Sequence, residues 1–396
     1  MKLTKIQRKR QKKVLTLIYT QSPISRIDIS KKTGITPAIV SDITSELIKG
    51  KLIEEIGEEN DREVKSGRKK ILLTISSKHS FYVGIELSEK FFSFVICDNK
   101  GEIFEKEVIL SSKYRDGLST ELFYEACKSF ITKFKHYDPK AIGMALPGHF
   151  YEEKQGIQTN NPFWEYFVFD QLPEYFCGPI YFSNNVECMA ISERLFNNIP
   201  NDDNYSILHV GRGMFCSSIY NGQLYGLTNV VIGEIGHVIV HPDGELCECG
   251  KRGCLQTYAS ESWIIKKSQL LYDNSTVTYL RQLCSERNQL SIEIILKAYQ
   301  LGDEGIINIL HNAIKYLAVT INNLGMIIDS RYIIIHGQLF TETQLYALLQ
   351  KYIEQNITLL STEKKQNILL KDYRETNGAV AAVAAVGLCI NRMLLS

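Results

Sequence analysis

The sequence lacks an apolar stretch long enough to cross a membrane. Its longest apolar run, from Ala379 to Ile390, spans 12 residues, most of them small. The opening residues, MKLTKIQRKRQKK, lack the apolar core and small-residue cleavage site of a secretory signal. Ten cysteines in 396 residues, three of them clustered, argue against a disulfide framework. Ordinary apolar (44%) and charged (22%) contents exclude disordered and fibrous classes. We therefore expect a cytoplasmic globular protein of two or three domains that does not enter a membrane.

The charge of the chain is nearly balanced overall but unevenly distributed. Residues 1–80 carry 18 basic and 9 acidic side chains, whereas the remaining 316 residues carry 27 basic and 35 acidic ones. A basic N-terminal segment on an acidic body indicates that the first segment meets a polyanion. The alternative is an ordinary solvated charged face, so the imbalance needs a motif to support it.

The first 50 residues have the pattern of a helix-turn-helix. Helical apolar spacing covers residues 5–20 and 25–32, and Gly34 suits the left-handed residue of a tight turn. Thr36 followed by Pro37 is a preferred helix start, and Gly50 ends that helix. In a helix-turn-helix this second helix lies in the DNA major groove. We expect it to expose Thr44 and to present these residues to DNA: Thr36, Pro37, Ala38, Ser41, Asp42 and Ser45.

Two short apolar segments, 51–56 and 67–73, flank a charged turn and predict the hairpin of a wing. Its basic residues Arg68 and Lys69 are placed to reach phosphates or the minor groove. We therefore predict a winged helix-turn-helix domain over residues 1–75. The alternative is a three-helix module that binds another protein.

From residue 81 the pattern changes to α/β. Strand-like runs at 81–87, 91–97 and 103–110 precede a helix near 117–135 and a buried strand at 141–146. A similar order follows: strands within 206–227, helices within 258–325, and a strand at 333–337. This weak repeat predicts two similar lobes with a cleft between them. We place the first lobe at 76–200, completed by a C-terminal helix at 375–396, and the second at 201–374.

One histidine and three cysteines lie within 18 residues on a glycine-rich segment: His237, Cys247, Cys249 and Cys254. This set fits a closed tetrahedral zinc site, and closed coordination indicates one structural Zn²⁺ per chain. The other cysteines lie on apolar stretches and are expected in the core: Cys97, Cys127, Cys177, Cys188, Cys216, Cys284 and Cys389.

Gly-Glu-Ile-Gly-His at 233–237, followed by Cys-Glu-Cys-Gly-Lys-Arg-Gly-Cys-Leu at 247–255, resembles the signature of the ROK family of repressors and sugar kinases. The N-terminal helix-turn-helix resembles that of the family's repressor branch. The resemblance covers nearly the whole chain. It implies an actin-like, ribonuclease-H-like two-lobe fold, a sugar pocket in the cleft, zinc on the four residues above, and DNA binding as a homodimer or higher homo-oligomer.

The resemblance also shows where this chain departs from the kinases. Their first phosphate loop corresponds to Glu86-Leu87-Ser88-Glu89-Lys90, which lacks its glycine, and the second has Phe215 and Ser217 in place of two glycines. Where the kinases have a Gly-Gly pair on the adenosine side of the nucleotide site, this chain has His336-Gly337. Where the kinases have a catalytic Asn-Asp pair, this chain has Asn184-Asn185. The amide of Asn185 cannot act as the general base that the aspartate provides. We predict a protein with no catalytic residues.

The groups that bind sugar hydroxyls are largely retained. The resemblance implies sugar contacts by Asn161, Asn184, Asn185, Glu234, His237 and Gln256. Trp164 either stacks on the sugar ring or packs in the core. The sequence therefore predicts a sugar-responsive repressor that binds double-stranded operator DNA. The alternatives are a sugar kinase fused to a DNA-binding domain and a regulator that senses a protein partner.

Overall fold

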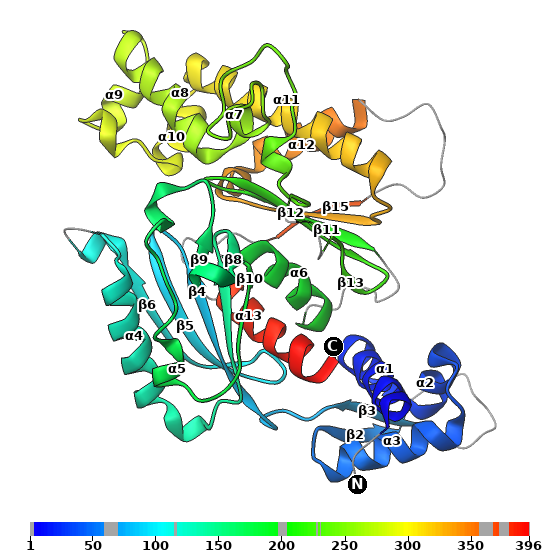
Figure 1. Ribbon diagram of the computed structural model, residues 1–396. Helices are drawn as coiled ribbons and strands as arrows, with labels where there is room; N and C mark the ends of the chain where they lie inside the picture. Colours follow the sequence, from blue (N-terminus) through cyan, green and yellow to red (C-terminus); the bar gives the residue numbers. More distant parts are fainter. Residues whose placement is uncertain are drawn as a thin grey trace. The chain divides into compact units, whose positions relative to one another are not determined.

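The structure is a computed structural model, and it forms two compact units. The first comprises Met1–Asp202 with Gly378–Ser396, and the second Asp203–Asn377. Each unit contains one five-stranded mixed sheet with helices packed on it (Figure 1). The described residues are 4–58, 70–114, 117–196, 204–226, 229, 231–355, 367–371 and 380–395.

The N-terminal part of the first unit is a small helical head with a three-stranded sheet. Its helices and strands are α1 (Lys5–Gln21), β1 (Ile24–Ser25), α2 (Arg26–Thr33), α3 (Pro37–Lys49), β2 (Ile53–Glu58) and β3 (Ile71–Ile75), with the sheet order β1-β3-β2. Gly34 ends α2 with φ of 70°, in the left-handed region that favours glycine. Val14, Ile18, Ile29, Val40 and Leu73 are buried in its core. This is the element order of a winged helix-turn-helix.

The sheet of the first lobe has four strands that run in one direction and one that runs opposite to them. Its order is β10 (Ile180–Asn184), β7 (Ile142–Leu146), β4 (Phe81–Leu87), β5 (Phe91–Asp98), β6 (Ile103–Leu110). Strands β4, β7 and β10 are parallel, so their carboxyl ends lie at one edge. Helix α4 (Thr120–Lys133) covers one face through an aromatic core, and α6 (Asn185–Phe196) and α13 (Val380–Ile390) lie on the other (Figure 1).

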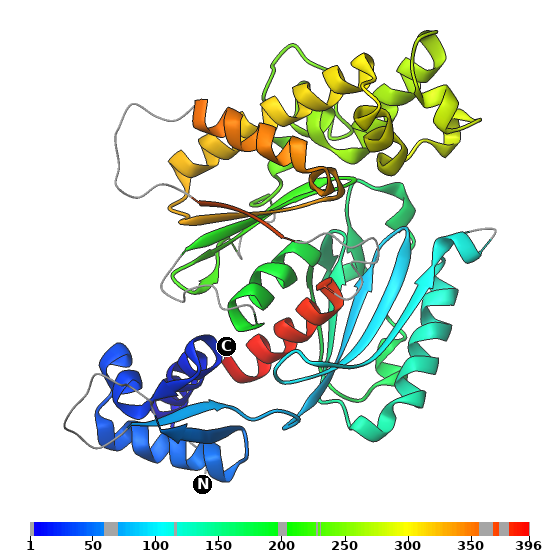
Figure 2. The same ribbon diagram turned by 180° about the vertical axis from the view of Figure 1, so that it is seen from behind.

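Helix α13 approaches the backbone of two central strands unusually closely. Figure 2 shows it beside α6, although nearly 200 residues separate the two in the chain. A Cβ at Gly84 in β4 would lie 1.9 Å from the Ala382 carbonyl oxygen, and one at Gly143 in β7 would lie 2.0 Å from that of Ala385. Glycine is therefore required at both positions by the space that α13 occupies.

The second unit repeats the sheet topology of the first. Its order is β13 (Gln223–Leu224), β12 (Met214–Tyr220), β11 (Tyr205–Val210), β14 (Tyr332–His336), β15 (Asn367–Leu370). Strands β11, β14 and β15 are parallel, and β12 runs antiparallel to both of its neighbours, β11 and β13. The predicted repeat of two similar α/β lobes is confirmed. The helices of this unit are α7 (Gln256–Ala259), α8 (Glu261–Asn274), α9 (Leu280–Leu283), α10 (Ile292–Gln300), α11 (Glu304–Ile327) and α12 (Thr343–Gln355).

Two burial predictions are wrong. Thr44 is fully buried, because its hydroxyl donates to the Val40 carbonyl and accepts a hydrogen bond from Arg26 Nε, each at 2.9 Å. Cys177 is exposed, whereas the other six cysteines expected in the core are buried. Among the helices that the structure describes, none is long and apolar enough to span a bilayer.

We expect Gly143→Ala to lower the free energy of unfolding by about 1–3 kcal/mol, the range for overpacking a close-packed core. The added methyl group would meet the backbone of α13, which cannot rotate aside as a side chain can. Urea unfolding measures the change. Gly50→Ala is the matched control, because its φ of −74° suits alanine and its closest contact would be 3.4 Å. Equal stability of the two variants would contradict this account of α13 packing.

Candidate functional site

The four predicted metal ligands form one cluster in the second unit. The donor atoms of His237, Cys247, Cys249 and Cys254 all lie within 4.8 Å of one another. The Cys249 and Cys254 sulfurs are 3.7 Å apart, and Cys247 Sγ is 3.6 Å from His237 Nδ1. Zinc–sulfur bonds of about 2.3 Å in a tetrahedron would place two sulfurs about 3.8 Å apart. The spacing of the donors therefore fits Zn²⁺.

The local chemistry also favours a cation. Burial raises the pKa of the Cys254 thiol to about 12, so this thiol does not ionise readily without a positive charge beside it. His237 Nδ1 faces the sulfurs, while Nε2 lies 4.0 Å from a Glu234 carboxylate oxygen. A carboxylate behind a ligating histidine is a common way to orient the ring.

A tight backbone fold brings these ligands together. Gly253 has φ of 69°, and a Cβ there would lie 1.6 Å from the His241 carbonyl oxygen. Cys247 N–H donates to the Lys251 carbonyl at 2.8 Å, which closes the turn that carries Cys249. Lys251 Nζ donates to the His237 carbonyl at 2.9 Å and ties the cysteine turn to the histidine segment. Lost ligation would therefore also loosen the segment that carries Glu234.

Three of the predicted sugar contacts occur in this part of the second unit. Glu234 precedes the short 3₁₀ helix Ile235–His237, which ends at His237, and Gln256 begins α7 two residues after Cys254. The Gln256 side-chain oxygen would lie 3.2 Å from a Cβ at Gly236 and 3.8 Å from one at Gly213. The structure thus brings Gln256 beside the segment of Glu234 and His237.

The segment that corresponds to the second phosphate loop of the kinases includes the turn between β11 and β12. The Phe215 ring is buried, and a Cβ at Gly233 would lie 2.5 Å from its tip. Beside this turn, His209 Nδ1 and His336 Nδ1 are 2.9 Å apart at the carboxyl ends of β11 and β14. Burial lowers the pKa of His209 to about 4, so this ring is neutral near pH 7 and offers no charge to a phosphate.

In the first unit, the predicted residues Asn184 and Asn185 lie at the carboxyl end of β10. Asn184 is buried; its oxygen accepts from Val186 N–H at 2.9 Å and its NH₂ donates to the Gly148 carbonyl at 3.5 Å. Its side chain thus caps the start of α6. Asn185 is half-buried, and its Nδ2 has no partner in the described part of the chain. Of the two amides, Asn185 has the donor free for a ligand.

Asn161 lies in the same unit, at the start of the 3₁₀ helix Pro162–Trp164. Its oxygen accepts from Phe163 N–H at 3.2 Å, and its NH₂ donates to the Glu89 carboxylate. Glu89 follows β4, so this hydrogen bond joins two loops 72 residues apart, and no local sequence signal announces it. Trp164 is only 1% exposed and packs in the aromatic core, which decides between the two roles considered for it.

The head places the predicted DNA-facing residues of α3 on its surface. On the opposite side of the helix, Val40, Ile43 and Leu47 are buried. All six side chains predicted to face DNA are exposed: Thr36, Pro37, Ala38, Ser41, Asp42 and Ser45. The wing residues Arg68 and Lys69 lie outside the described residues. Strands β2 and β3, which flank them, pair antiparallel as a wing requires.

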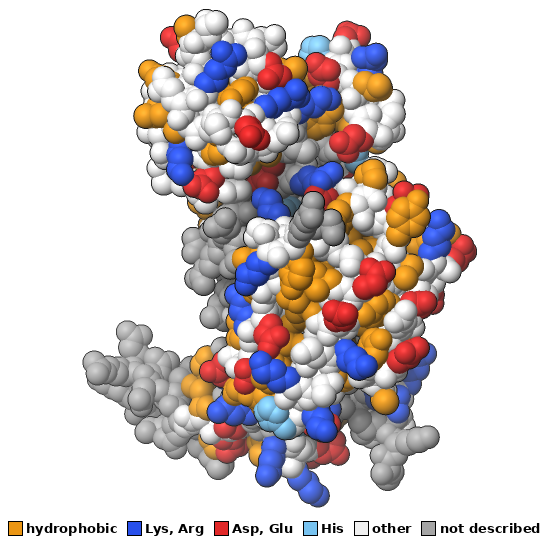
Figure 3. Space-filling view, turned by 90° about the vertical axis from the view of Figure 1, so that its left-hand side faces the viewer, with side chains coloured by type: hydrophobic (Ala, Val, Ile, Leu, Met, Phe, Trp, Pro, Cys, Tyr) orange, Lys and Arg blue, Asp and Glu red, His pale blue; other side chains and the backbone are white. Residues whose placement is uncertain are grey.

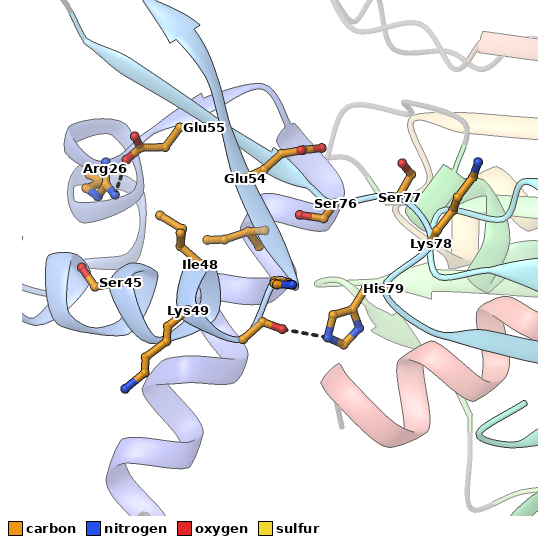
Figure 4. A pocket seen from close by; sticks show the side chains of 13 residues that line it. Arg26, Ser45, Ile48, Lys49, Glu54, Glu55, Ser76, Ser77, Lys78 and His79 are labelled. Atoms are coloured by element: carbon orange, nitrogen blue, oxygen red, sulfur yellow. Dashed lines mark hydrogen bonds and ion pairs between the residues drawn. The ribbon is translucent and has the colours of Figure 1, made fainter. Parts of the chain in front are cut away.

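The connection between the head and the lobe is hydrogen-bonded along its length. Asn99 accepts from His79 N–H at 3.0 Å and donates to the Ser76 carbonyl at 2.8 Å, and Asp98 accepts from Lys78 N–H at 2.9 Å. The His79 ring reaches the Gly50 carbonyl at the end of α3, at 3.1 Å (Figure 4). A hollow of about 1000 Å³ lies between α3, β2 and this connection. The turn after β5 is therefore linked to the end of α3.

The comparisons with known proteins agree with this fold. The model of the ROK family matches residues 82–387, so this chain belongs to the ROK family. The chain is 26% identical over 324 residues to the xylose repressor of Bacillus subtilis (strain 168), covering 81% of this chain and 80% of that protein. It is 26% identical over 342 residues to the DNA-binding transcriptional dual regulator NagC of Escherichia coli (strain K12), covering 82% and 79%.

Solved structures share the architecture. A crystal structure of a ROK family transcriptional regulator, described as a homologue of the E. coli MLC protein, matches with a TM-score of 0.74 and 22% identity over 97% of this chain and 96% of that one. A ROK family glucokinase from Streptomyces griseus, in complex with glucose and AMPPNP, matches with a TM-score of 0.62 and 18% identity over 78% and 99%. The predicted two-lobe fold class is confirmed.

We expect purified protein to contain about one zinc ion per chain, as one His₁Cys₃ cluster holds one ion. Cys249→Ser should lower the zinc content and the unfolding temperature together, because the metal ties the cysteine turn to the His237 segment. Elemental analysis and thermal unfolding measure the two effects. The exposed Cys177→Ser is the control and should change neither. Full zinc occupancy in Cys249→Ser would show that the ion lies elsewhere.

Proposed function

We propose that this protein is a cytoplasmic transcriptional repressor that binds operator DNA through its head, responds to a sugar bound by its ROK body, and lacks kinase activity. The observation that carries the proposal is the exposed polar face of α3, which starts directly after the Gly34 turn. The similarity to the xylose repressor and to NagC supports it.

The charge distribution supports DNA as the partner of the head. Residues 1–80 have a net charge of +9 and the rest of the chain a net charge of −8. On the face of the molecule in Figure 3, Lys and Arg side chains are interspersed with Asp and Glu. Small residues on α3 allow a close approach to base edges, and repressors of this type bind as dimers that read two half-sites. We include a homodimer in the proposal.

Hydroxyl-binding groups support a sugar as the effector. Candidate groups occur in each unit: the half-buried Asn185 amide in the first, and the Glu234 carboxylate with the Gln256 amide in the second. The donor of Asn185 is uncommitted, whereas Asn161 and Asn184 are engaged in hydrogen bonds within the protein. Asn161 and Asn184 would then shape the site rather than supply its strongest contacts.

The kinase alternative receives less support from the side chains. Phe215 fills space beside the β11–β12 turn, where a phosphate would need close backbone approach. Asn185 offers an amide where proton abstraction needs a carboxylate. The fold itself does not decide, because the glucokinase from Streptomyces griseus shares it.

The hydrogen-bonded connection from Ser76 to Ser80 supports a route from body to head. Asp98 and Asn99 fix its backbone, and His79 contacts the last turn of α3. A sugar that binds the ROK body with different affinity in two conformations would shift the head between operator-bound and free states.

We expect Ser41→Glu to weaken binding to the operator at least tenfold, because it places a carboxylate on the DNA-facing side of α3. The operator is first selected from random duplexes and binding is then followed by fluorescence anisotropy. Asn308→Glu, on the exposed face of α11, adds the same charge in the second unit and should leave affinity unchanged. Equal affinities of the two variants would remove α3 from the DNA interface.

We also expect one sugar from a panel of hexoses, pentoses and N-acetylated hexosamines to raise the unfolding temperature by about 5 °C at saturation without ATP. That sugar should release the operator and should not be phosphorylated when ATP is added. Asn185→Ala should abolish the release and keep operator affinity, while Asn308→Ala changes neither. Turnover of ATP with the same sugar at about 1 s⁻¹ or faster would favour the kinase instead.

A further inference from the structure

Helix α1 carries a dense group of basic side chains that has no assigned role. Its first nine residues, Lys5–Lys13, include six basic residues, and the helix contains no acidic one. None of these six side chains forms an ion pair within the described part of the chain. Their positive charge is therefore not neutralised within the described head.

This basic half of α1 extends away from the packed core. Residues 4–10 are all exposed, including Ile6 at 66%, while burial begins at Val14. Four of the basic residues follow helical spacing and share one face of the helix: Lys5, Arg8, Lys9 and Lys12. We call these four residues the α1 basic face.

The arrangement is unfavourable for an isolated helix. Cations at a helix N-terminus oppose the helix dipole, and like charges four residues apart, such as Lys5 with Lys9 and Arg8 with Lys12, repel one another. The helix nevertheless starts with a complete capping box, in which Thr4 N–H donates to Gln7 Oε1 at 2.8 Å and Gln7 N–H donates to Thr4 Oγ1 at 3.3 Å. A bound polyanion would offset both the unfavourable interaction with the helix dipole and the repulsion between like charges.

A hydrogen bond joins this part of α1 to the end of α2, just before the turn that leads into α3. Lys13 Nζ donates to the Thr33 carbonyl at 2.8 Å, and Thr33 ends α2 just before the turn that leads to Thr36. The α1 basic face begins one residue before Lys13 and extends about 10 Å further along the helix. Through Lys13, the basic half of α1 is therefore tied to the turn that leads into α3, the helix that carries Ala38 and Ser41.

We propose that the α1 basic face binds the phosphate backbone of the same DNA whose groove receives α3. The partner is committed to DNA because duplex DNA carries one negative charge per about 1.7 Å, which matches a linear row of cations. Such contacts position the head without reading sequence. The inference rests on the proposed function, since it extends the DNA interface of the head beyond α3.

The test uses the full chain and a labelled 30-base-pair duplex of arbitrary sequence. The variant R8Q/K9Q/K12Q removes three charges and keeps side chains that favour helix. We expect at least tenfold weaker binding and a slope of log affinity against log salt that is smaller by about 2 to 3, because each lost phosphate contact contributes about 0.9. The variant R8K/K9R/K12R keeps the charges and should bind like the wild type.

The control variant K106Q/K135Q/K154Q removes three exposed charges from the first lobe. It should leave the salt slope unchanged, and far-ultraviolet circular dichroism should show equal helix content in all variants. Equal salt slopes for the α1 variant and this control would overturn the proposal while leaving the proposed function intact. An unchanged slope with altered oligomeric mass would overturn it in favour of contact between protein copies. Failure of the wild type to bind any duplex would overturn both.

Discussion

The pairing of parallel strands determines where this protein can hold a ligand. In each unit a central strand has an antiparallel hairpin on one side and parallel strands on the other. Parallel pairing brings several carboxyl ends to a single sheet edge, where loops rather than strand backbone face the surroundings. Asn185 in the first unit and the Gly211–Gly213 turn in the second both lie at such an edge, directly after a parallel strand. The fold supplies the positions, and the side chains decide the chemistry.

The side chains at these edges bind mainly to their own protein. Glu89 holds Asn161, Asn184 caps α6, and His209 pairs with His336. Buried polar groups must be satisfied, and here neighbouring residues of the same protein satisfy them. A scaffold shared with a ROK family glucokinase thus keeps a polar interior at its sheet edges.

Local sequence signals were sufficient for the helix-turn-helix, most sheet strands and the His–Cys cluster, because each depends on residues close together in the chain. Burial of Thr44 depends on Arg26, 18 residues away, and the contact of Asn161 depends on Glu89. The NH₂ group of Asn184 depends on the Gly148 carbonyl, 36 residues away. No prediction from the sequence covers α12 or the short edge strand β15, whose residues are mostly exposed and give no alternating apolar pattern. Contacts across the fold decide such features.

Helix α13 also has a consequence for synthesis of the protein. The ribosome makes the head and the strands of the first lobe early, but the helix that packs against Gly84 and Gly143 is made only after the second unit. Until residue 390 leaves the exit tunnel, α6 covers that face of the sheet without α13, while the whole second unit has already been translated. A prematurely terminated polypeptide therefore carries a recognition helix on an incomplete lobe. The apolar strand surface that α13 would cover stays exposed in it, and such surfaces are what quality-control proteases recognise.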